Sequence, residues 1–246
     1  MAPRLVAFDT ETYLIKKYST PPKLVCVTIY DEALPAEYQR QLYNAKDGIE
    51  VLRKYFEDPE VSITVHNASF DIPVLIAYDH TIMSSVFKAC AQNRVHCSLI
   101  RELILGAADP KTHGQQHQQV KLADKIYATG NTLIGCMYQY FCQNGAFNVN
   151  KHNFDITPMI AEKTDPNSVR LRYSEMDGKQ ISEYPPQFVE YALDDAKHAY
   201  DLFKAQEERS LRMQKAYALN RHPLAVSAHE STMDIMLAYM GSITGL

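Results

Sequence analysis

The sequence lacks any long apolar run. A membrane-spanning helix needs roughly 20 consecutive apolar residues, and no stretch of the 246 residues approaches that length. The N-terminus, Met1 to Arg4, passes directly into the apolar residues Leu5 to Phe8, which leaves no room for the charged region, apolar region and cleavage site of a signal peptide. We therefore expect no membrane partner and a protein that stays in the cytoplasm.

The sequence also has few cysteines. Their number, five, is odd, and no two of them form a C-x-x-C pair. This pattern argues against a disulfide framework and against a common zinc ribbon. The sequence therefore predicts reduced thiols at Cys26, Cys90, Cys97, Cys136 and Cys142.

An excess of positive charge is absent as well. The formal net charge is −4 at pH 7, whereas a protein that coats duplex nucleic acid nonspecifically relies on many Lys or Arg contacts to phosphates. The charge is compatible with an enzyme that holds a few nucleotides. In such an enzyme, bound divalent cations would supply much of the local positive charge.

No internal repeat and no low-complexity tract is present, and the length suits one large α/β domain, alone or with a helical appendage. Apolar segments rich in β-branched residues predict strands at 5–9 and 23–30, and residues 37–43 are a third candidate strand. A helix is predicted at 45–56, followed by a short buried strand at 61–65. Three strands, a helix and a strand indicate an α/β fold.

The rest of the chain gives weaker signals. They predict a helix at 70–78, a strand at 94–97, a helix from residue 98, an exposed loop at 109–119 and short helices at 122–128 and 133–141. From Pro185 the apolar residues are again periodic to about residue 206, and two prolines suit the start of that helix. A second helical stretch at 211–240, broken at Pro223, ends the chain.

Three short segments carry side chains suited to metal chemistry, and the first is Phe8-Asp9-Thr10-Glu11-Thr12. Side chains at positions i and i+2 of a strand point to the same face, so Asp9 and Glu11 can converge. Two negative charges that close repel each other, and a cation between them would relieve the repulsion. A solvated acidic strand end is the alternative interpretation of this segment taken alone.

The second segment, Val65-His66-Asn67-Ala68-Ser69-Phe70-Asp71, runs from a predicted buried strand into a predicted helix. The carboxyl ends of strands are where α/β proteins place their sites, so the position favours function. Helix capping by Asn67, Ser69 or Asp71 is an equally good interpretation, because all three are favoured cap residues.

The third segment, Tyr191-Ala-Leu-Asp194-Asp195, lies in a predicted helix. Asp195 falls within the apolar stripe of that helix, whereas Asp194 aligns with its polar face. A carboxylate on the core side of a helix is unfavourable unless it is paired or bound to a metal. Asp195 therefore needs a partner, and Tyr191 lies one turn before it on the same side.

Taken together, the segments read D-x-E, then N-x-x-x-D after a strand, then Y-x-x-x-D on a late helix. This ordered pattern resembles the DEDD exonucleases of the tyrosine subgroup, in particular the 3′-5′ proofreading exonuclease domain of family A DNA polymerases. Bacteriophage polymerases are also similar in connecting sequences such as Ser98-Leu-Ile-Arg-Glu-Leu and Leu171-Arg-Tyr-Ser-Glu-Met-Asp-Gly. The resemblance covers roughly residues 4–206.

The resemblance implies an RNase H-like exonuclease fold, a mixed five-stranded sheet flanked by helices, with a C-terminal helical extension. It also implies four carboxylates that hold two divalent metal ions, Mg²⁺ or Mn²⁺. Asp9 would bridge both ions, Glu11 and Asp195 would complete the site on the nucleophile side, and Asp71 would hold the second ion through water. Tyr191 would orient the attacking water.

The implied reaction is hydrolysis of single-stranded DNA from its 3′ end to nucleoside 5′-monophosphates, for proofreading during DNA replication in a bacterial or phage-infected cell. Thr12 and Asn67 fall where the family contacts the terminal nucleotide. Leu14 or Ile15 falls where an apolar side chain wedges against the last base. These four residues are the expected substrate-binding side chains.

Two rival functions stay open. An RNA-trimming member of the superfamily would carry the same carboxylates. A non-catalytic module that binds single strands would be expected to have lost at least one of them, and all four are present. His113 and His117 are spaced H-x-x-x-H, but the Gln-rich stretch around them offers no third zinc ligand, which favours a solvated loop.

We expect an exonuclease domain at 1–208 and a helical extension at 209–246 that looks like the helix opening a polymerase region. No polymerase motif follows it in this sequence. A free-standing nuclease, the exonuclease subunit of a split polymerase and a piece of a longer polymerase all fit this arrangement. A separate DNA polymerase chain is therefore a candidate partner.

Overall fold

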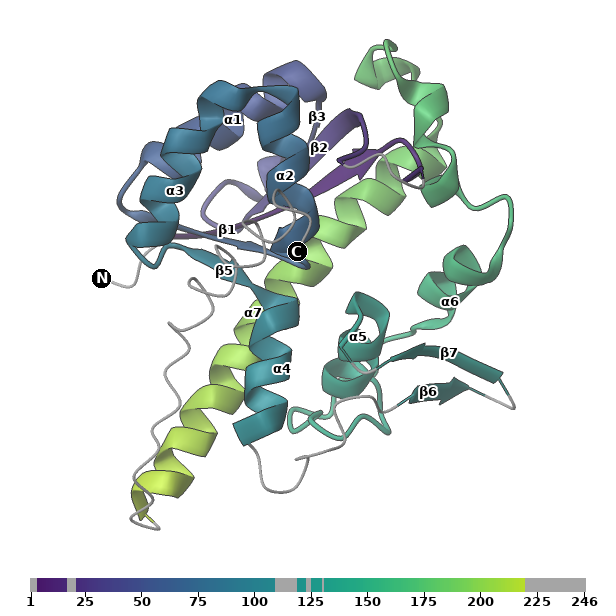
Figure 1. Ribbon diagram of the computed structural model, residues 1–246. Helices are drawn as coiled ribbons and strands as arrows, with labels where there is room; N and C mark the ends of the chain where they lie inside the picture. Colours follow the sequence, from purple (N-terminus) through teal and green to yellow (C-terminus); the bar gives the residue numbers. More distant parts are fainter. Residues whose placement is uncertain (1–3, 17–20, 109–118, 123–124, 130, 220–246) are drawn as a thin grey trace.

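The computed structural model describes residues 4–16, 21–108, 119–122, 125–129 and 131–219 (Figure 1). Its centre is a five-stranded sheet in the order β3-β2-β1-β4-β5. β1 and β2 are antiparallel, as are β2 and β3, whereas β4 and β5 extend the sheet in parallel with β1. The strands are β1 (Arg4–Thr12), β2 (Leu24–Asp31), β3 (Arg40–Asn44), β4 (Val61–Val65) and β5 (Val95–Cys97). The predicted mixed sheet flanked by helices is therefore confirmed.

Three helices cover one face of the sheet: α1 (Ala45–Glu57), α2 (Ala68–Tyr78) and α3 (Met83–Ala91) (Figure 1). The largest apolar core lies between them and the sheet, and it includes Val6 and Phe8 from β1. Because side chains alternate along a strand, Ala7 points to the opposite face. The central strand is thus buried on both faces, as a strand covered by helices on both sides must be.

The opposite face is crossed by α7 (Pro186–Leu219), a continuous helix of 34 residues. Ala196 and Ala199 pack against Ala7 and Tyr30, and these small side chains let the helix approach the sheet closely. The second half of α7 continues beyond the sheet alongside α4 (Ser98–Ala108) (Figure 1). The expected division into two helical stretches at 206 and 211 is wrong, because residues there are buried against neighbouring helices and keep the helix intact.

A smaller group of elements lies beside this half of the molecule: the hairpin of β6 (Gln119–Leu122) and β7 (Lys125–Thr129), α5 (Leu133–Phe141) and α6 (Thr157–Thr164) (Figure 1). The helix predicted at 122–128 is wrong. Over so short a segment, its apolar residues fit the spacing of a helix and the spacing of a strand equally well. The segment forms a strand because it pairs antiparallel with residues 119–122. α3 and α6 were not expected from the sequence.

Short 3-10 turns connect the remaining parts: η1 (Ala36–Tyr38), η2 (His80–Ile82), η3 (Val169–Leu171), η4 (Tyr173–Met176) and η5 (Ile181–Glu183). η1 occupies the start of the strand predicted at 37–43, so that strand begins later than expected. The five cysteines are buried and free, as predicted. Among the described helices none is long and apolar enough to span a membrane.

Most of the expected extension at 209–246 lies outside the described residues, as do His113 and His117. α7 itself passes through position 208 without a break.

Candidate active site

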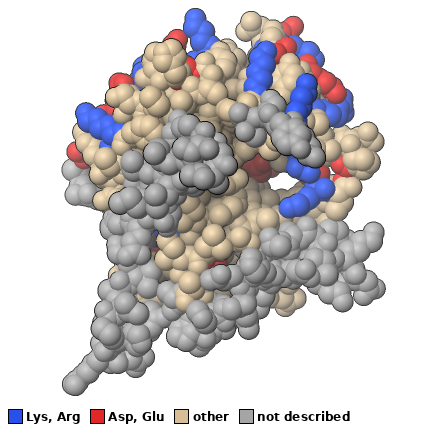
Figure 2. Space-filling view, viewed as in Figure 1, with Lys and Arg blue, Asp and Glu red and all other residues tan. Residues whose placement is uncertain are grey.

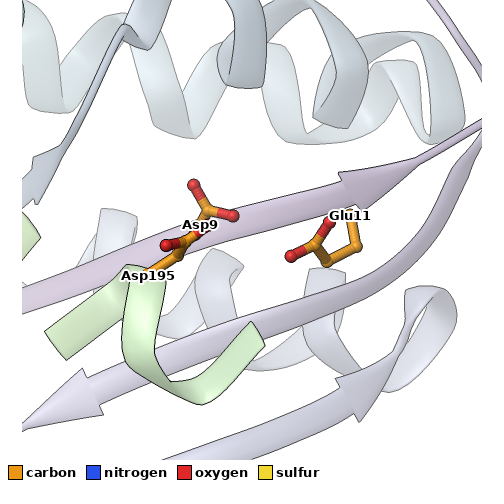
Figure 3. A group of neighbouring side chains, drawn as sticks. All are labelled: Asp9, Glu11 and Asp195. Carbon is orange, nitrogen blue, oxygen red and sulfur yellow. The ribbon is translucent and has the colours of Figure 1, made fainter. Parts of the chain in front are cut away.

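Asp9 and Glu11 lie near the end of β1, on the face of the sheet that α7 covers. Their neighbour two residues earlier, Ala7, packs against Ala196 and Ala199 of α7, and the alternation of the strand carries Asp9 and Glu11 to the same side. Figure 3 shows the side chains of both residues on β1, beside Asp195 of the helix. The predicted convergence of this pair is therefore present in the fold.

Asp195 reaches the same point from α7. One carboxylate oxygen from each of Asp9, Glu11 and Asp195 lies within 4.8 Å of the others (Figure 3). Asp194, its neighbour in sequence, instead forms an ion pair with Arg40 at the surface. The helical phase that distinguished Asp195 from Asp194 is thus the phase found in the structure, because α7 turns its apolar stripe toward the sheet.

Asp71 approaches from the first turn of α2, on the other face of the strand. Its Oδ1 accepts a hydrogen bond of 2.5 Å from the hydroxyl of Thr10, which stands between Asp9 and Glu11 in sequence. Asp71 is 2% exposed. It is not one of the three clustered carboxylates, but its charge acts on Asp9 and Glu11.

The electrostatics of this carboxylate cluster favour a bound cation. Burial, and then the neighbouring carboxylates, raise the pKa of Asp9 and of Glu11 well above the ordinary range. Burial likewise raises the pKa of Asp71 and of Asp195 to about 7. The raised pKa values reflect the cost of burying charged carboxylates close to one another.

Glu11 also has an oxygen that fits a metal ligand. Its Oε1 is buried without a hydrogen-bond partner among the described residues, and the side chain is only 7% exposed. A buried polar atom is normally satisfied, and hard carboxylate oxygens are the ligands that Mg²⁺ and Mn²⁺ prefer. The donor set Asp9, Glu11 and Asp195 therefore fits a divalent cation.

Tyr191 lies one helical turn before Asp195 and places its phenol beside that carboxylate. Burial raises the pKa of Tyr191 above its ordinary value, and the charges of Asp195 and Glu11 raise it further. The phenol therefore stays protonated at neutral pH and can donate a hydrogen bond. Its ring is also close to that of Tyr173, with centroids 6.2 Å apart.

The arrangement of these residues agrees with a comparison to known families. The family model described as 3′-5′ exonuclease, that of the exonuclease domain of family A DNA polymerases, matches residues 2–209. The chain belongs to this 3′-5′ exonuclease family. It is therefore a nuclease of the DEDD type, a hydrolase of a family that uses divalent metal ions. No curated protein sequence matches it significantly.

Two solved structures share the fold at low sequence identity, and a third is less similar. A structure named "apo form of the nuclease" matches with a TM-score of 0.54 at 13% identity, covering 99% of this chain and 86% of that one. Brucella melitensis NrnC bound to pGG matches with a TM-score of 0.52 at 14% identity and the same two coverages. Escherichia coli RNase D gives 0.46 at 14% identity, covering 95% of this chain and 45% of the other.

The four predicted substrate-binding residues lie close in sequence to Glu11 and Asp71. Thr12 ends β1, and its hydroxyl donates to the Tyr13 carbonyl oxygen at 2.9 Å. Leu14 and Ile15 follow it and are more than half exposed, as an apolar wedge against a base would have to be. Asn67 precedes α2 in the left-handed region, with φ 66°. Their contacts with substrate stay a prediction.

Sequence patterns missed other side chains near the site. A cavity of about 450 Å³ adjoins Tyr191 and Asp195, and its wall includes Lys163 and Arg170. Both cations come from the part of the chain where the periodic signal is weakest, so spacing offered no means of finding them. Thr10 was in view within the D-x-E segment, but only the fold shows that it holds Asp71.

Proposed function

We propose that this chain is a metal-dependent exonuclease that hydrolyses single-stranded DNA from the 3′ end and releases nucleoside 5′-monophosphates. Its biological role in this proposal is proofreading, as part or subunit of a family A DNA polymerase. The observation that carries the proposal is the cluster of Asp9, Glu11 and Asp195, without a paired cation among the described residues, beside Tyr191 in a chain of this family.

The four carboxylates would hold two Mg²⁺ or Mn²⁺ ions, which polarise the scissile phosphate and lower the pKa of the attacking water. The charges of all three other carboxylates act on Asp9, so Asp9 is suited to contribute to both ions. Glu11 and Asp195 would complete the site on the nucleophile side, and Asp71 would act on the second ion through water. Tyr191 would orient the water through its protonated phenol.

Trimming of short oligonucleotides, RNA included, is the second candidate. The observation that favours it is the fold shared with NrnC, whose structure holds pGG. The same four carboxylates serve either nucleic acid, so the cluster does not distinguish the two. DNA is preferred in the proposal because the matching family model is that of the polymerase exonuclease domain.

A paired-substrate assay tests the proposal. Single-stranded DNA and RNA of one sequence, each labelled at the 5′ end, are incubated with the full chain and Mg²⁺ or Mn²⁺. We expect stepwise shortening of DNA, release of nucleoside 5′-monophosphates and no reaction by Asp9→Ala. A wild-type chain inert with both metals would refute the enzyme, and binding without cleavage would indicate the non-catalytic module. Much faster cleavage of RNA than of DNA would mean that RNA, and not DNA, is the substrate.

The polymerase association needs its own measurement. Size-exclusion chromatography of the chain with and without a family A polymerase that lacks its own exonuclease domain would show whether the two co-elute. Co-elution supports a split polymerase. Separate elution at micromolar concentrations of both chains would refute the role as a polymerase subunit, but it would not contradict the nuclease activity.

A further inference from the structure

The cavity beside the carboxylate cluster has a cationic wall. It measures about 450 Å³ and lies between the first half of α7 and the elements α5, α6 and η3. Tyr191 and Asp195 line it on the α7 side, so it adjoins the proposed reaction centre. Lys163 of α6 and Arg170 of η3 line the opposite side. In Figure 2, Lys and Arg side chains border an opening on this face of the molecule.

Within the described part of the chain, neither of these two cations has a counter-ion. Both side chains are exposed, and neither forms an ion pair or a side-chain hydrogen bond with another described residue. They are nonetheless near each other, since the charge of Arg170 adds to partial burial in lowering the pKa of Lys163. Neither cation is consumed by an ion pair with a described residue, so both remain available to bind an anion in the cavity.

The fold holds the pair in place. Ser168 donates a hydrogen bond of 2.6 Å from its hydroxyl to Oε2 of Glu162, which joins α6 to η3 and so brings Lys163 and Arg170 together. Ser168 is 2% exposed. Just after η3, the hydroxyl of Tyr173 donates to the carbonyl oxygen of Phe188 at 2.7 Å, and this anchors the segment to α7.

The acidic residues of the cavity limit where an anion can lie. Glu162 accepts a hydrogen bond from Ser168 and Asp194 is paired with Arg40, and both line the cavity together with Glu190. These carboxylates lie on or beside α7 and α6, so the favourable position for a phosphate is against Arg170. The charge of Arg170 also lowers the pKa of Glu11 and of Asp195, which places its guanidinium close to the reaction centre.

We propose that Lys163 and Arg170 bind a backbone phosphate of the substrate strand immediately 5′ to the scissile bond. This inference rests on the proposed function. A 3′-5′ exonuclease that releases mononucleotides leaves only one phosphate on the departing side, the scissile one. A second phosphate within reach of the site must therefore be the linkage between the second and third nucleotides from the 3′ end. Paired cations there would position the strand over the carboxylates.

The first experiment uses variants of the full chain. Arg170→Gln and Lys163→Gln should each raise KM for a single-stranded oligonucleotide several-fold, and the double variant about tenfold or more, with a smaller change in kcat. The slope of log(kcat/KM) against log[salt] should become shallower by about 0.7 for each phosphate interaction that a substitution removes. Arg172→Gln is the matched control, because Arg172 pairs with Glu175 and does not line the cavity.

The second experiment neutralises the phosphate instead of the protein. A single methylphosphonate replaces the second linkage from the 3′ end, while the scissile linkage stays ordinary. The first cleavage by the wild-type chain should slow about tenfold, whereas cleavage by the double variant should slow little further, because the variant no longer binds that phosphate. The same substitution eight linkages from the 3′ end is the control and should have little effect on either.

The outcomes separate this inference from the proposed function. If the neutral linkage slows the wild type and the double variant equally, the phosphate interaction is refuted while the nuclease stands. If Arg170→Gln changes the Mn²⁺ concentration needed for half-maximal rate and leaves KM unchanged, Arg170 acts on the carboxylates and the inference is wrong. A wild-type chain inert on every substrate refutes the function, and the inference with it.

Discussion

Helix α7 takes part in two buried polar clusters, one in each half, and they differ in whether the charges are paired. In the first half, Asp195 joins Asp9 and Glu11, and no described cation pairs with these three carboxylates. In the second half, Arg209 joins Glu102 of α4. The two positions are 14 residues apart in sequence, or about 21 Å along the helix.

The second cluster contains its own counter-ion. Arg209 Nη1 and Gln206 Nε2 each lie 3.0 Å from a carboxylate oxygen of Glu102, and the Tyr140 hydroxyl donates to Oε2 at 2.8 Å. The side chains of Arg209 and Glu102 are 4% and 10% exposed. A buried ion pair with these additional hydrogen bonds joins α4, α5 and α7.

The presence or absence of a counter-ion distinguishes charged residues that stabilise the fold from charged residues that serve the function. Where the chain supplies its own counter-ion, the cluster holds helices together. Where it supplies none, folding leaves carboxylates with raised pKa values, and a cation from outside would complete the site. Substitutions in the two clusters should therefore affect different measurements.

The largest effect is expected from the first cluster. Asp195→Asn should reduce the single-turnover rate of oligonucleotide hydrolysis by at least about a hundredfold, because under the proposed function it removes a charge that would hold the metal. Asp194→Asn, which changes the adjacent residue in the same way, should alter that rate less than about twofold. Equal losses in both variants would contradict the assignment by helical phase.

Glu102→Ala should affect stability instead. Removing one partner of a buried ion pair leaves Arg209 uncompensated, with an expected loss of about 3–5 kcal/mol in the free energy of unfolding. Urea denaturation would measure it. The rate per folded molecule should stay near that of the wild type at a temperature where the variant is folded. Unchanged stability would mean that the second cluster does not hold α4 and α7 together.

The response to pH and metal is expected to be smaller. The folded-state pKa of Asp71 and of Asp195 is raised to about 7, so the metal-free folded state binds protons that the unfolded chain has released. Its stability should fall as pH rises from about 4 through 7. Mg²⁺ competes with these protons, so the increase in Tm that it causes should be larger at pH 8 than at pH 5.5. An increase independent of pH would contradict this.

The smallest effect is expected at the surface. Arg40 and Asp194 form an exposed ion pair, and pairs of this kind contribute roughly 0.2–1 kcal/mol. Arg40→Ala should therefore lower the free energy of unfolding by less than about 1 kcal/mol and leave the hydrolysis rate unchanged. A loss comparable with that of Glu102→Ala would show that exposure is a poor guide to the role of a charge in this protein.

Local patterns predicted the site better than the outer parts of the fold. Alternation along a strand placed Asp9 and Glu11 on one face, and the apolar stripe selected Asp195, because both periods are properties of the backbone itself. The hairpin at β6 and β7 was predicted as a helix. A short segment carries little periodic information, and strand pairing depends on a partner elsewhere in the chain.

The sequence by itself determined the order of the three acidic segments, the α/β class and the side of α7 that Asp195 occupies. Only the tertiary structure decided that Thr10 holds Asp71, that Arg209 pairs with Glu102, and that Lys163 and Arg170 face the carboxylates across a cavity. The physical reason is distance along the chain. Backbone periodicity acts over a few residues, whereas these contacts join positions that only the packing of the helices on the sheet brings together.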